Sequence, residues 1–150
     1  KFVRPDFKDV DHMNETMINN WNRVVMPSDK VYHLGDFTFG NKSNIAKIAS
    51  RLNGHKRLVL GNHDYDAKLY YPYFEKVMSW RQFGGNKFKR PIVMTHYPLH
   101  ERSFAYRTGN TGVNIHGHIH QNKLPLPWIN VCVEHHNYTP IAIDDLLDSI

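Results

Sequence analysis

Residues 57–64 read Arg-Leu-Val-Leu-Gly-Asn-His-Asp, a short apolar run that ends in side chains able to bind a metal or move a proton. Three other segments repeat this plan: 31–36 (Val-Tyr-His-Leu-Gly-Asp), 92–96 (Ile-Val-Met-Thr-His) and 113–120 (Val-Asn-Ile-His-Gly-His-Ile-His). In open α/β folds, ligands gather at the carboxyl ends of strands. Four strands that all end in nitrogen and oxygen ligands therefore predict one assembled site, a two-metal hydrolase site for divalent metals.

Hydrophobic periodicity predicts strands and helices that alternate along the chain. Met13, Met17 and Trp21 recur at helical spacing, so residues 10–25 form a predicted amphipathic helix with its cap and first turn at Asp9 to His12. Strands that alternate with helices indicate the α/β fold class. The other predicted elements are strands at 31–35, 56–60, 113–116 and 128–133, helices at 44–52 and 145–149 (the latter capped by Asp144), a short helix or loop at 68–74, a hairpin at 76–95 and a surface loop at 101–111.

Composition is that of an ordinary globular protein. The 150 residues are 41% hydrophobic and 22% charged, which fits one domain with a real core. No apolar run approaches the roughly 20 residues that span a membrane, and no signal peptide is visible, so we expect a cytoplasmic protein without membrane contact. The single cysteine, Cys132, excludes an intrachain disulfide and is predicted to be buried and inert. The net charge of +5 favours anionic partners.

The order of these motifs resembles the calcineurin-like metallophosphoesterases, in a small bacterial or phage-type branch. The pattern of that family runs D-x-H, G-D, G-N-H-[DE], a lone His after a strand, and G-H-x-H. Four of the five blocks occur in order between Gly35 and His120. The resemblance implies two packed mixed β-sheets flanked by helices, an αββα sandwich, with residues 1–150 as a single metallophosphoesterase domain.

The first block of the family pattern is absent from the chain. Asp11 and His12 are adjacent and do not form D-x-H. The resemblance places that block on an N-terminal strand upstream of Lys1, so we expect this strand to be missing and the domain to be N-terminally incomplete. The loss would uncover a sheet edge or core face, which invites homo-oligomers or domain swapping.

The resemblance also implies a set of metal ligands. Asp36 would bridge two metals with its two carboxylate oxygens. Asn62, His96 and His118 would complete the second metal, while His120 would belong to the first. The expected cofactors are divalent ions of Mn, Zn, Fe, Ni or Mg, two in the intact family site. Because the first metal keeps only Asp36 and His120, we expect one tightly bound ion in this chain.

Two residues beside Asn62 are predicted to be catalytic. His63 directly follows a metal ligand, so it would point near the substrate and act as the general acid. Asp64 would orient His63 and favour its imidazolium form, or would only cap a helix. Gly35, Gly61 and Gly117 are predicted to allow tight turns and close backbone approach.

The remaining histidines have weaker assignments. His116 is either a neighbour of the ligands or structural, and the sequence leaves both open. We interpret His33 as a core residue or a neighbour of the ligands, His100 as a surface residue, and His135 and His136 as solvated.

Three functions remain open on the sequence. The first is metal-dependent hydrolysis of phosphate esters, chiefly nucleotide-type or other small phosphodiesters. The second is a non-hydrolysing, metal-bound interaction module of the same fold. The third is a nucleic-acid-binding domain, which rests on the charge and on the basic, aromatic segment 80–90. For that segment a solvated β-hairpin is the preferred interpretation.

Overall fold

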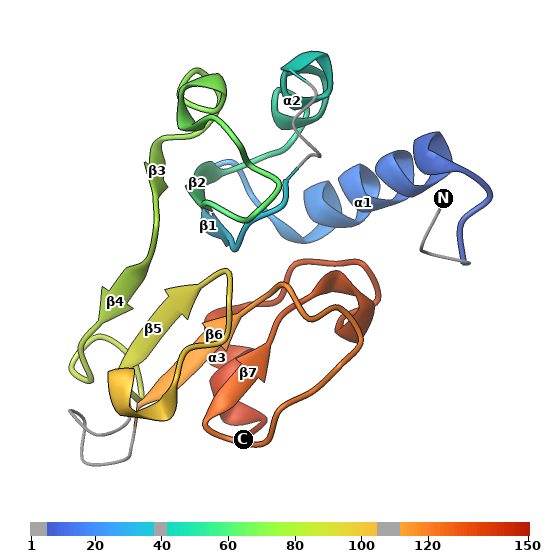
Figure 1. The fold of residues 1–150 in the computed structure, drawn as a ribbon. Coiled ribbons are helices and arrows are strands. Elements are labelled where there is room, and N and C mark those ends of the chain that lie inside the picture. The colour runs from blue at the N-terminus through green and yellow to red at the C-terminus, as the bar shows by residue number, and fades with distance from the viewer. Residues whose placement is uncertain (1–5, 38–41, 105–111) are drawn as a thin grey trace.

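A computed structural model describes residues 6–37, 42–104 and 112–150, and its strands form two sheets (Figure 1). The first sheet has the order β1-β2-β3, and all of its strands are parallel. The second has the order β4-β5-β6-β7, in which β4 is antiparallel to β5 and the other pairs are parallel. The strands are β1 (Lys30–His33), β2 (His55–Val59), β3 (Lys76–Met78), β4 (Arg81–Phe83), β5 (Ile92–Thr95), β6 (Val113–His116) and β7 (Trp128–Asn130).

Buried apolar side chains join the two sheets in one cluster. Leu34 and Val59, from the end of β1 and from β2, pack with side chains of β4 to β7 and of the C-terminal helix α3 (Ile143–Asp148). All four residues of β6 are buried, and its two polar side chains, Asn114 and His116, make hydrogen bonds within the protein. The core therefore lies between the sheets and holds their strand ends together.

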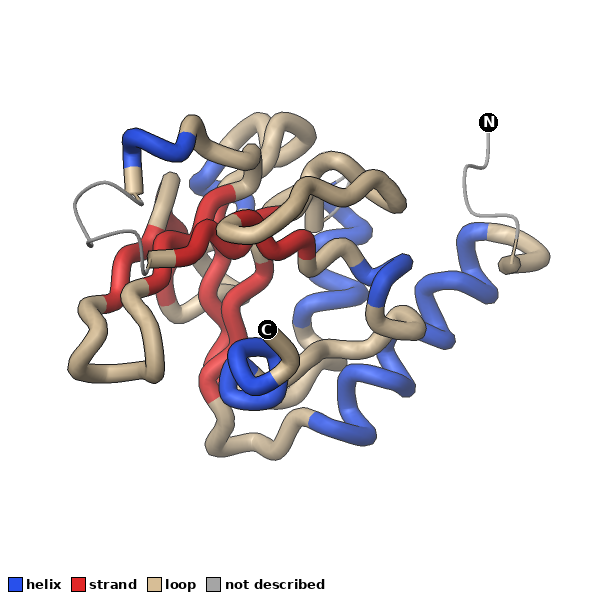
Figure 2. Tube along the Cα trace, turned by 90° about the horizontal axis from the view of Figure 1, so that it is seen from below, coloured by secondary structure: helices blue, strands red, loops and turns tan. Residues whose placement is uncertain are grey.

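Two helices cover the outer face of the first sheet. The first, α1 (Val10–Val24), begins at the cap Asp9, whose carboxylate accepts a hydrogen bond from the backbone N–H of His12 at 2.7 Å, as predicted. Trp21 of α1 packs with residues around α2 (Lys42–Ala49), and Ile45 of α2 packs on Leu58 of β2. Figure 2 shows α1 to one side of the strands. The helix α3 packs in the cluster that joins the two sheets, and the predicted α/β fold with two packed sheets and helices is confirmed.

The predicted hairpin at 76–95 is wrong in its first part. β3 pairs with β2 in the first sheet, and the antiparallel pair starts only at Arg81. Successive side chains of β3 face opposite sides, with Val77 in the outer cluster and Met78 in the cluster between the sheets. This alternation fits a strand covered on both faces, so the two residues 79–80 carry the chain from one sheet to the other.

The C-terminal segment also differs from the prediction. β7 ends at Asn130, whose side-chain oxygen accepts a hydrogen bond from the backbone N–H of Cys132 at 2.8 Å and turns the chain into a 3-10 helix, η4 (Val133–His135). Cys132 is consequently half-buried, not buried. Asp144 lies inside α3, and the residue at the cap position is Ala142.

None of the helices in the described parts of the chain has the length and apolarity needed to cross a membrane. Of the surface loop predicted at 101–111, residues 105–111 lie outside the described residues, and 101–103 form the 3-10 helix η2 (Glu101–Ser103).

Candidate metal centre

Four polar side chains meet where four strands end. Asp36 follows β1 and Asn62 follows β2, so the first sheet supplies two of them. His96 follows β5 and His118 follows β6, so the second sheet supplies the other two. We call these four residues the metal centre. The structure thus brings together four of the five ligands expected from the sequence.

His96 lies in the middle of the metal centre. Its Nε2 atom is 2.8 Å from the side-chain oxygen of Asn62, 3.1 Å from Nδ1 of His118 and 3.3 Å from a carboxylate oxygen of Asp36. One ligand atom from each of Asp36, His96 and His118 lies within 4.8 Å of the others. A single ion could contact all of these atoms after small side-chain adjustments.

A hydrogen bond on the far side of the His96 ring fixes which nitrogen faces the other ligands. Nδ1 of His96 lies 2.7 Å from the carbonyl oxygen of Leu34. Because a carbonyl only accepts, Nδ1 must carry the proton, and the neutral ring then presents a lone pair at Nε2. That lone pair faces the oxygens of Asn62 and Asp36, which also accept. The donor set therefore fits a divalent cation with nitrogen and oxygen ligands.

The charges of the metal centre are coupled. Burial opposes a charge on His96, but the hydrogen bond to Asp36 raises the pKa of the ring above its ordinary value. Burial likewise works against the Asp36 carboxylate, yet hydrogen bonds from His96 and from the His63 backbone N–H keep the pKa of Asp36 below its usual range. Burial, together with His96, lowers the pKa of His118, which favours the neutral ring that a metal needs.

We expect divalent-metal affinity to fall as the pH is lowered, because a proton and the cation compete for Nε2 of His96. The raised pKa of His96 means that the metal-free protein keeps this proton to a higher pH than an ordinary imidazole. Below that pKa the affinity should drop by roughly tenfold per pH unit, with about one proton released on binding. Calorimetry in buffers of different ionisation enthalpy measures the release. An affinity that stays constant between pH 8 and pH 5.5 would contradict the assignment.

The backbone of the site is held in an uncommon conformation. Asp36, His118 and His120 have φ angles of 55°, 70° and 50°, in the left-handed region that non-glycine residues seldom occupy. Such residues persist only where surrounding contacts hold them, and they cluster at functional sites. The positive φ angles of Asp36 and His118 therefore fit functional positions.

Two glycines let the ligand loops of β1 and β2 touch. A Cβ atom on Gly35 would lie 2.5 Å from Nδ1 of His96, and one on Gly61 would lie 2.5 Å from the backbone nitrogen of Asp36. Both positions therefore require glycine. At Gly117 an added Cβ would meet its nearest atom at 3.5 Å, an ordinary contact, so the close approach predicted there is wrong.

His63 lies beside Asp36, with its backbone N–H donating to an Asp36 carboxylate oxygen at 2.8 Å. Nδ1 of the His63 ring is 3.3 Å from the hydroxyl of Tyr65. The Asp64 carboxylate is buried and accepts hydrogen bonds from three backbone N–H groups and from Tyr70. The cap of the following 3-10 helix is Asp66, so the helix-cap alternative for Asp64 is wrong. Its orientation of His63 stays a prediction.

His120 lies apart from the metal centre. Its Nδ1 atom is 3.4 Å from a carboxylate oxygen of Glu134, and the side chain is half exposed. The backbone carbonyl of His120 accepts hydrogen bonds from the side chains of Asn130 and His135. The prediction that His135 and His136 are solvated is wrong, because both side chains are half-buried. The role of His120 as a ligand of a first metal stays a prediction.

Three more histidines differ in how deeply they are buried. His116 is fully buried in β6, bonds through Nδ1 to the Gly117 carbonyl at 2.8 Å, and has its pKa lowered by burial, which fits the structural alternative. His33 is half-buried with its ring edge-to-face against Phe37. His100 is exposed and caps η2, as a surface residue would.

Sequence reasoning missed three tyrosines near the metal centre. The Tyr97 ring lies 4.6 Å from that of His118 and 4.9 Å from that of His96, between ring centroids. Tyr65 contacts His63, and Tyr70 contacts Asp64. Tyr65 and Tyr97 each closely follow a predicted site residue, a signal that could have found them. Tyr70 offered no such signal, because it lies six residues beyond Asp64.

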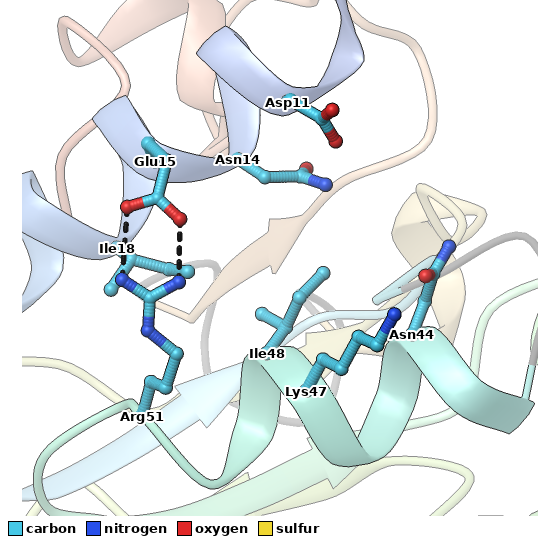
Figure 3. Close-up of a pocket in the computed structure, with 8 residues that line it drawn as sticks. All are labelled: Asp11, Asn14, Glu15, Ile18, Asn44, Lys47, Ile48 and Arg51. Carbon is cyan, nitrogen blue, oxygen red and sulfur yellow. Dashed lines mark hydrogen bonds and ion pairs between the residues drawn. The ribbon is translucent and has the colours of Figure 1, made fainter.

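A second feature, a pocket between α1 and α2, shares no residue with the metal centre (Figure 3). The Arg51 guanidinium donates to both carboxylate oxygens of Glu15 across it, one at 2.9 Å. Exposed ion pairs of this kind contribute little to stability. The pocket is lined by Asp11, Asn14, Glu15, Ile18, Asn44, Lys47, Ile48 and Arg51.

Comparison with known protein families shows which family the chain belongs to. The sequence model of the calcineurin-like phosphoesterase superfamily domain matches residues 11–132. The chain belongs to this superfamily. The match contains the whole metal centre together with His63 and Asp64, so the phosphoesterase domain carries its candidate site within the shared region.

Relatives of this phosphoesterase domain come from archaea, phages and bacteria. The uncharacterized protein MJ1445 of Methanocaldococcus jannaschii is 34% identical, over 96% of this chain and 78% of its own length. The gene 66 protein of Mycobacterium phage L5 is 31% identical, over 75% of this chain and 66% of its own length. The crystal structure of AQ665 from Aquifex aeolicus, a protein of unknown function, superposes with a TM-score of 0.72 at 28% identity and covers 95% of this chain and 87% of its own.

Proposed function

We propose that this chain hydrolyses phosphate esters, and phosphodiesters in particular, with a divalent cation held by Asp36, Asn62, His96 and His118. The observation that carries the proposal is the convergence of three lone-pair donors, from Asn62, His118 and Asp36, on Nε2 of His96, whose tautomer is fixed by Leu34. When bound, the cation supplies Lewis acidity and lowers the pKa of water. Membership of the phosphoesterase superfamily supports the substrate class.

His63 serves as the general acid in this proposal. The Tyr65 hydroxyl lies 3.3 Å from Nδ1, and in this proposal Nε2 donates a proton to the leaving oxygen. The backbone N–H of His63 bonds to Asp36, so the main chain of His63 is tied to the metal centre. Imidazole is suited to this task because its pKa lies near neutral pH.

Exposed aromatic rings beside the site support nucleotide-type diesters as substrates. Tyr97 is 49% exposed while it contacts two ligands of the metal centre, and Tyr65 is 75% exposed while it contacts His63. Large aromatic side chains left in water beside a catalytic group offer a face on which a planar base can stack.

Replacing Tyr97 with alanine is expected to raise KM for a dinucleotide by about 5- to 100-fold, the loss of one stacking contact. KM for a phosphodiester with two small alkyl groups should change much less, because no ring can stack. Tyr71, which is 60% exposed, offers the matched control as Tyr71→Ala. Equal rises in KM for both substrates would instead indicate damage to the neighbouring ligands.

Turnover of bis-p-nitrophenyl phosphate by the metal-loaded chain, measured with the metal content per chain, tests the proposed function. We expect about one tightly bound ion and metal-dependent hydrolysis that chelation abolishes. A bound ion without turnover would identify the non-hydrolysing module.

The nucleic-acid-binding alternative has less support. Arg81 and Lys87 of the basic hairpin both lie over the ring of Phe83, with their charged groups 4.4 and 5.8 Å from its centroid. Lys89 pairs with Asp148 at 3.5 Å. These contacts within the chain occupy part of the charge of the segment, as expected of a solvated hairpin.

A further inference from the structure

A buried carboxylate lies between the two ligand loops of the first sheet. Asp64 is only 6% exposed. One of its oxygens, Oδ2, accepts hydrogen bonds from the backbone N–H groups of Asp36, at 2.7 Å, and Gly61, at 2.8 Å. One atom of Asp64 therefore binds the loop after β1 and the loop after β2 at the same time.

The other oxygen of Asp64 is also occupied. Oδ1 accepts from the backbone N–H of Phe37 at 3.2 Å and from the hydroxyl of Tyr70 at 2.7 Å, and Tyr70 is itself fully buried. Four donors use the roughly four lone-pair positions of a carboxylate. A buried charge is tolerated when it is hydrogen-bonded in this way, so the arrangement is specific for an acceptor-only group.

These bonds act on the conformation of Asp36. Its left-handed backbone, φ 55°, turns the N–H groups of Asp36 and Phe37 toward the same carboxylate. The same turn directs the Asp36 side chain toward His96 and the His63 backbone. Charge-assisted hydrogen bonds of this kind can offset the cost of a strained backbone.

We propose that Asp64 and Tyr70 form a positioning pair that sets the metal affinity of the centre, by fixing the Asp36 loop against the loop that carries Asn62. Asp64 holds the backbone of both ligand loops, and Tyr70 holds Asp64. This inference rests on the proposed function, because it presumes that the metal centre binds a cation.

The test compares metal dissociation constants of folded variants, measured by calorimetry with Mn²⁺ or Zn²⁺. Asp64→Asn is expected to weaken binding by about 10- to 100-fold, because an amide turns an NH₂ group toward backbone donors and outer partners of metal ligands have effects of this size. Tyr70→Phe removes one of four hydrogen bonds and should weaken binding by about 2- to 10-fold. In the double variant, Tyr70→Phe should weaken metal binding little beyond the effect of Asp64→Asn, because Tyr70 acts through Asp64.

Matched controls separate positioning from general stability. Asp66→Asn alters a carboxylate two residues away that only caps η1, and Tyr73→Phe alters a tyrosine three residues from Tyr70; both should keep the wild-type dissociation constant. Asp64→Glu keeps the charge but displaces the carboxylate by a methylene, so it should not restore binding. Restored binding in Asp64→Glu would show that charge, and not position, matters.

Each failure has its own signature. If the wild-type chain binds a cation and Asp64→Asn binds it equally well, the positioning role is wrong while the proposed function stands. If Asp64→Asn does not fold, Tyr70→Phe decides, and an unchanged dissociation constant there overturns the proposal. If the wild-type chain binds no divalent cation, the proposed function itself fails.

Discussion

Replacing His63 with glutamine is expected to lower turnover of a phosphodiester by about 10²- to 10⁴-fold while the metal content stays at the wild-type level. The proton on the ring is lost, but the backbone N–H that bonds to Asp36 at 2.8 Å remains. The four side chains that converge on the cation are unchanged. A fall in kcat without a loss of metal is thus the signature of a general acid.

The leaving group provides an internal check on His63. Turnover of bis-p-nitrophenyl phosphate should fall less than turnover of a diester with alkyl leaving groups, because p-nitrophenolate leaves without protonation. His100→Gln is the matched control, since His100 is exposed and its ring accepts a hydrogen bond from the backbone N–H of Arg102. If His63→Gln loses its metal, or if both substrates slow equally, the assignment of His63 as the acid is wrong.

Replacing Gly61 with alanine is expected to lower both metal affinity and turnover by about 10²-fold or more. The new Cβ would lie 2.5 Å from the backbone nitrogen of Asp36 and against the Asp36 carboxylate, so the two ligand loops must separate. A displacement of about 1 Å at a catalytic site can cost 10²-fold in rate. Calorimetry with Mn²⁺ and steady-state kinetics measure the two effects.

Two other glycines serve as controls for Gly61. Gly117→Ala lies within the same set of motifs, yet its Cβ would make only ordinary contacts at 3.5 Å and beyond. Gly84→Ala, in the β4–β5 turn, would meet only the Asn86 side chain, at 3.1 Å. Both variants should retain wild-type metal affinity. If Gly61→Ala also retains it, the close contact of the two loops is not what sets the geometry of the metal centre.

The convergence of the metal centre could be anticipated because its signal is local. A polar residue directly after a short apolar run is expected at a strand end, and parallel strands gather their ends at one edge. Asp36, Asn62, His96 and His118 follow this rule. The role of His120 stays a prediction, and its Nδ1 atom lies 3.4 Å from a carboxylate oxygen of Glu134.

Hydrogen bonds and strand pairings that depend on the folded structure could not be predicted from the sequence. The partners of Asp64 are backbone groups of two loops and a tyrosine six residues on, and no periodicity marks them. The pairing of β3 could not be predicted either. From the sequence, Lys76–Met78 could pair with either neighbouring strand, and the choice depends on which hydrophobic cluster each side chain enters. The helix α1 was predictable because its cap and its apolar stripe are both local.

The crossing of the chain between β3 and β4 divides the ligands evenly, with Asp36 and Asn62 before it and His96 and His118 after it. A cation bound by these four residues would hold together two halves of the protein, which the backbone joins through only residues 79 and 80. By mass action, an ion at a hundred times its dissociation constant adds about 2.7 kcal/mol to the free energy of unfolding. Metal binding and folding would then be coupled equilibria. The supply of metal would affect the lifetime of the folded protein as well as its activity.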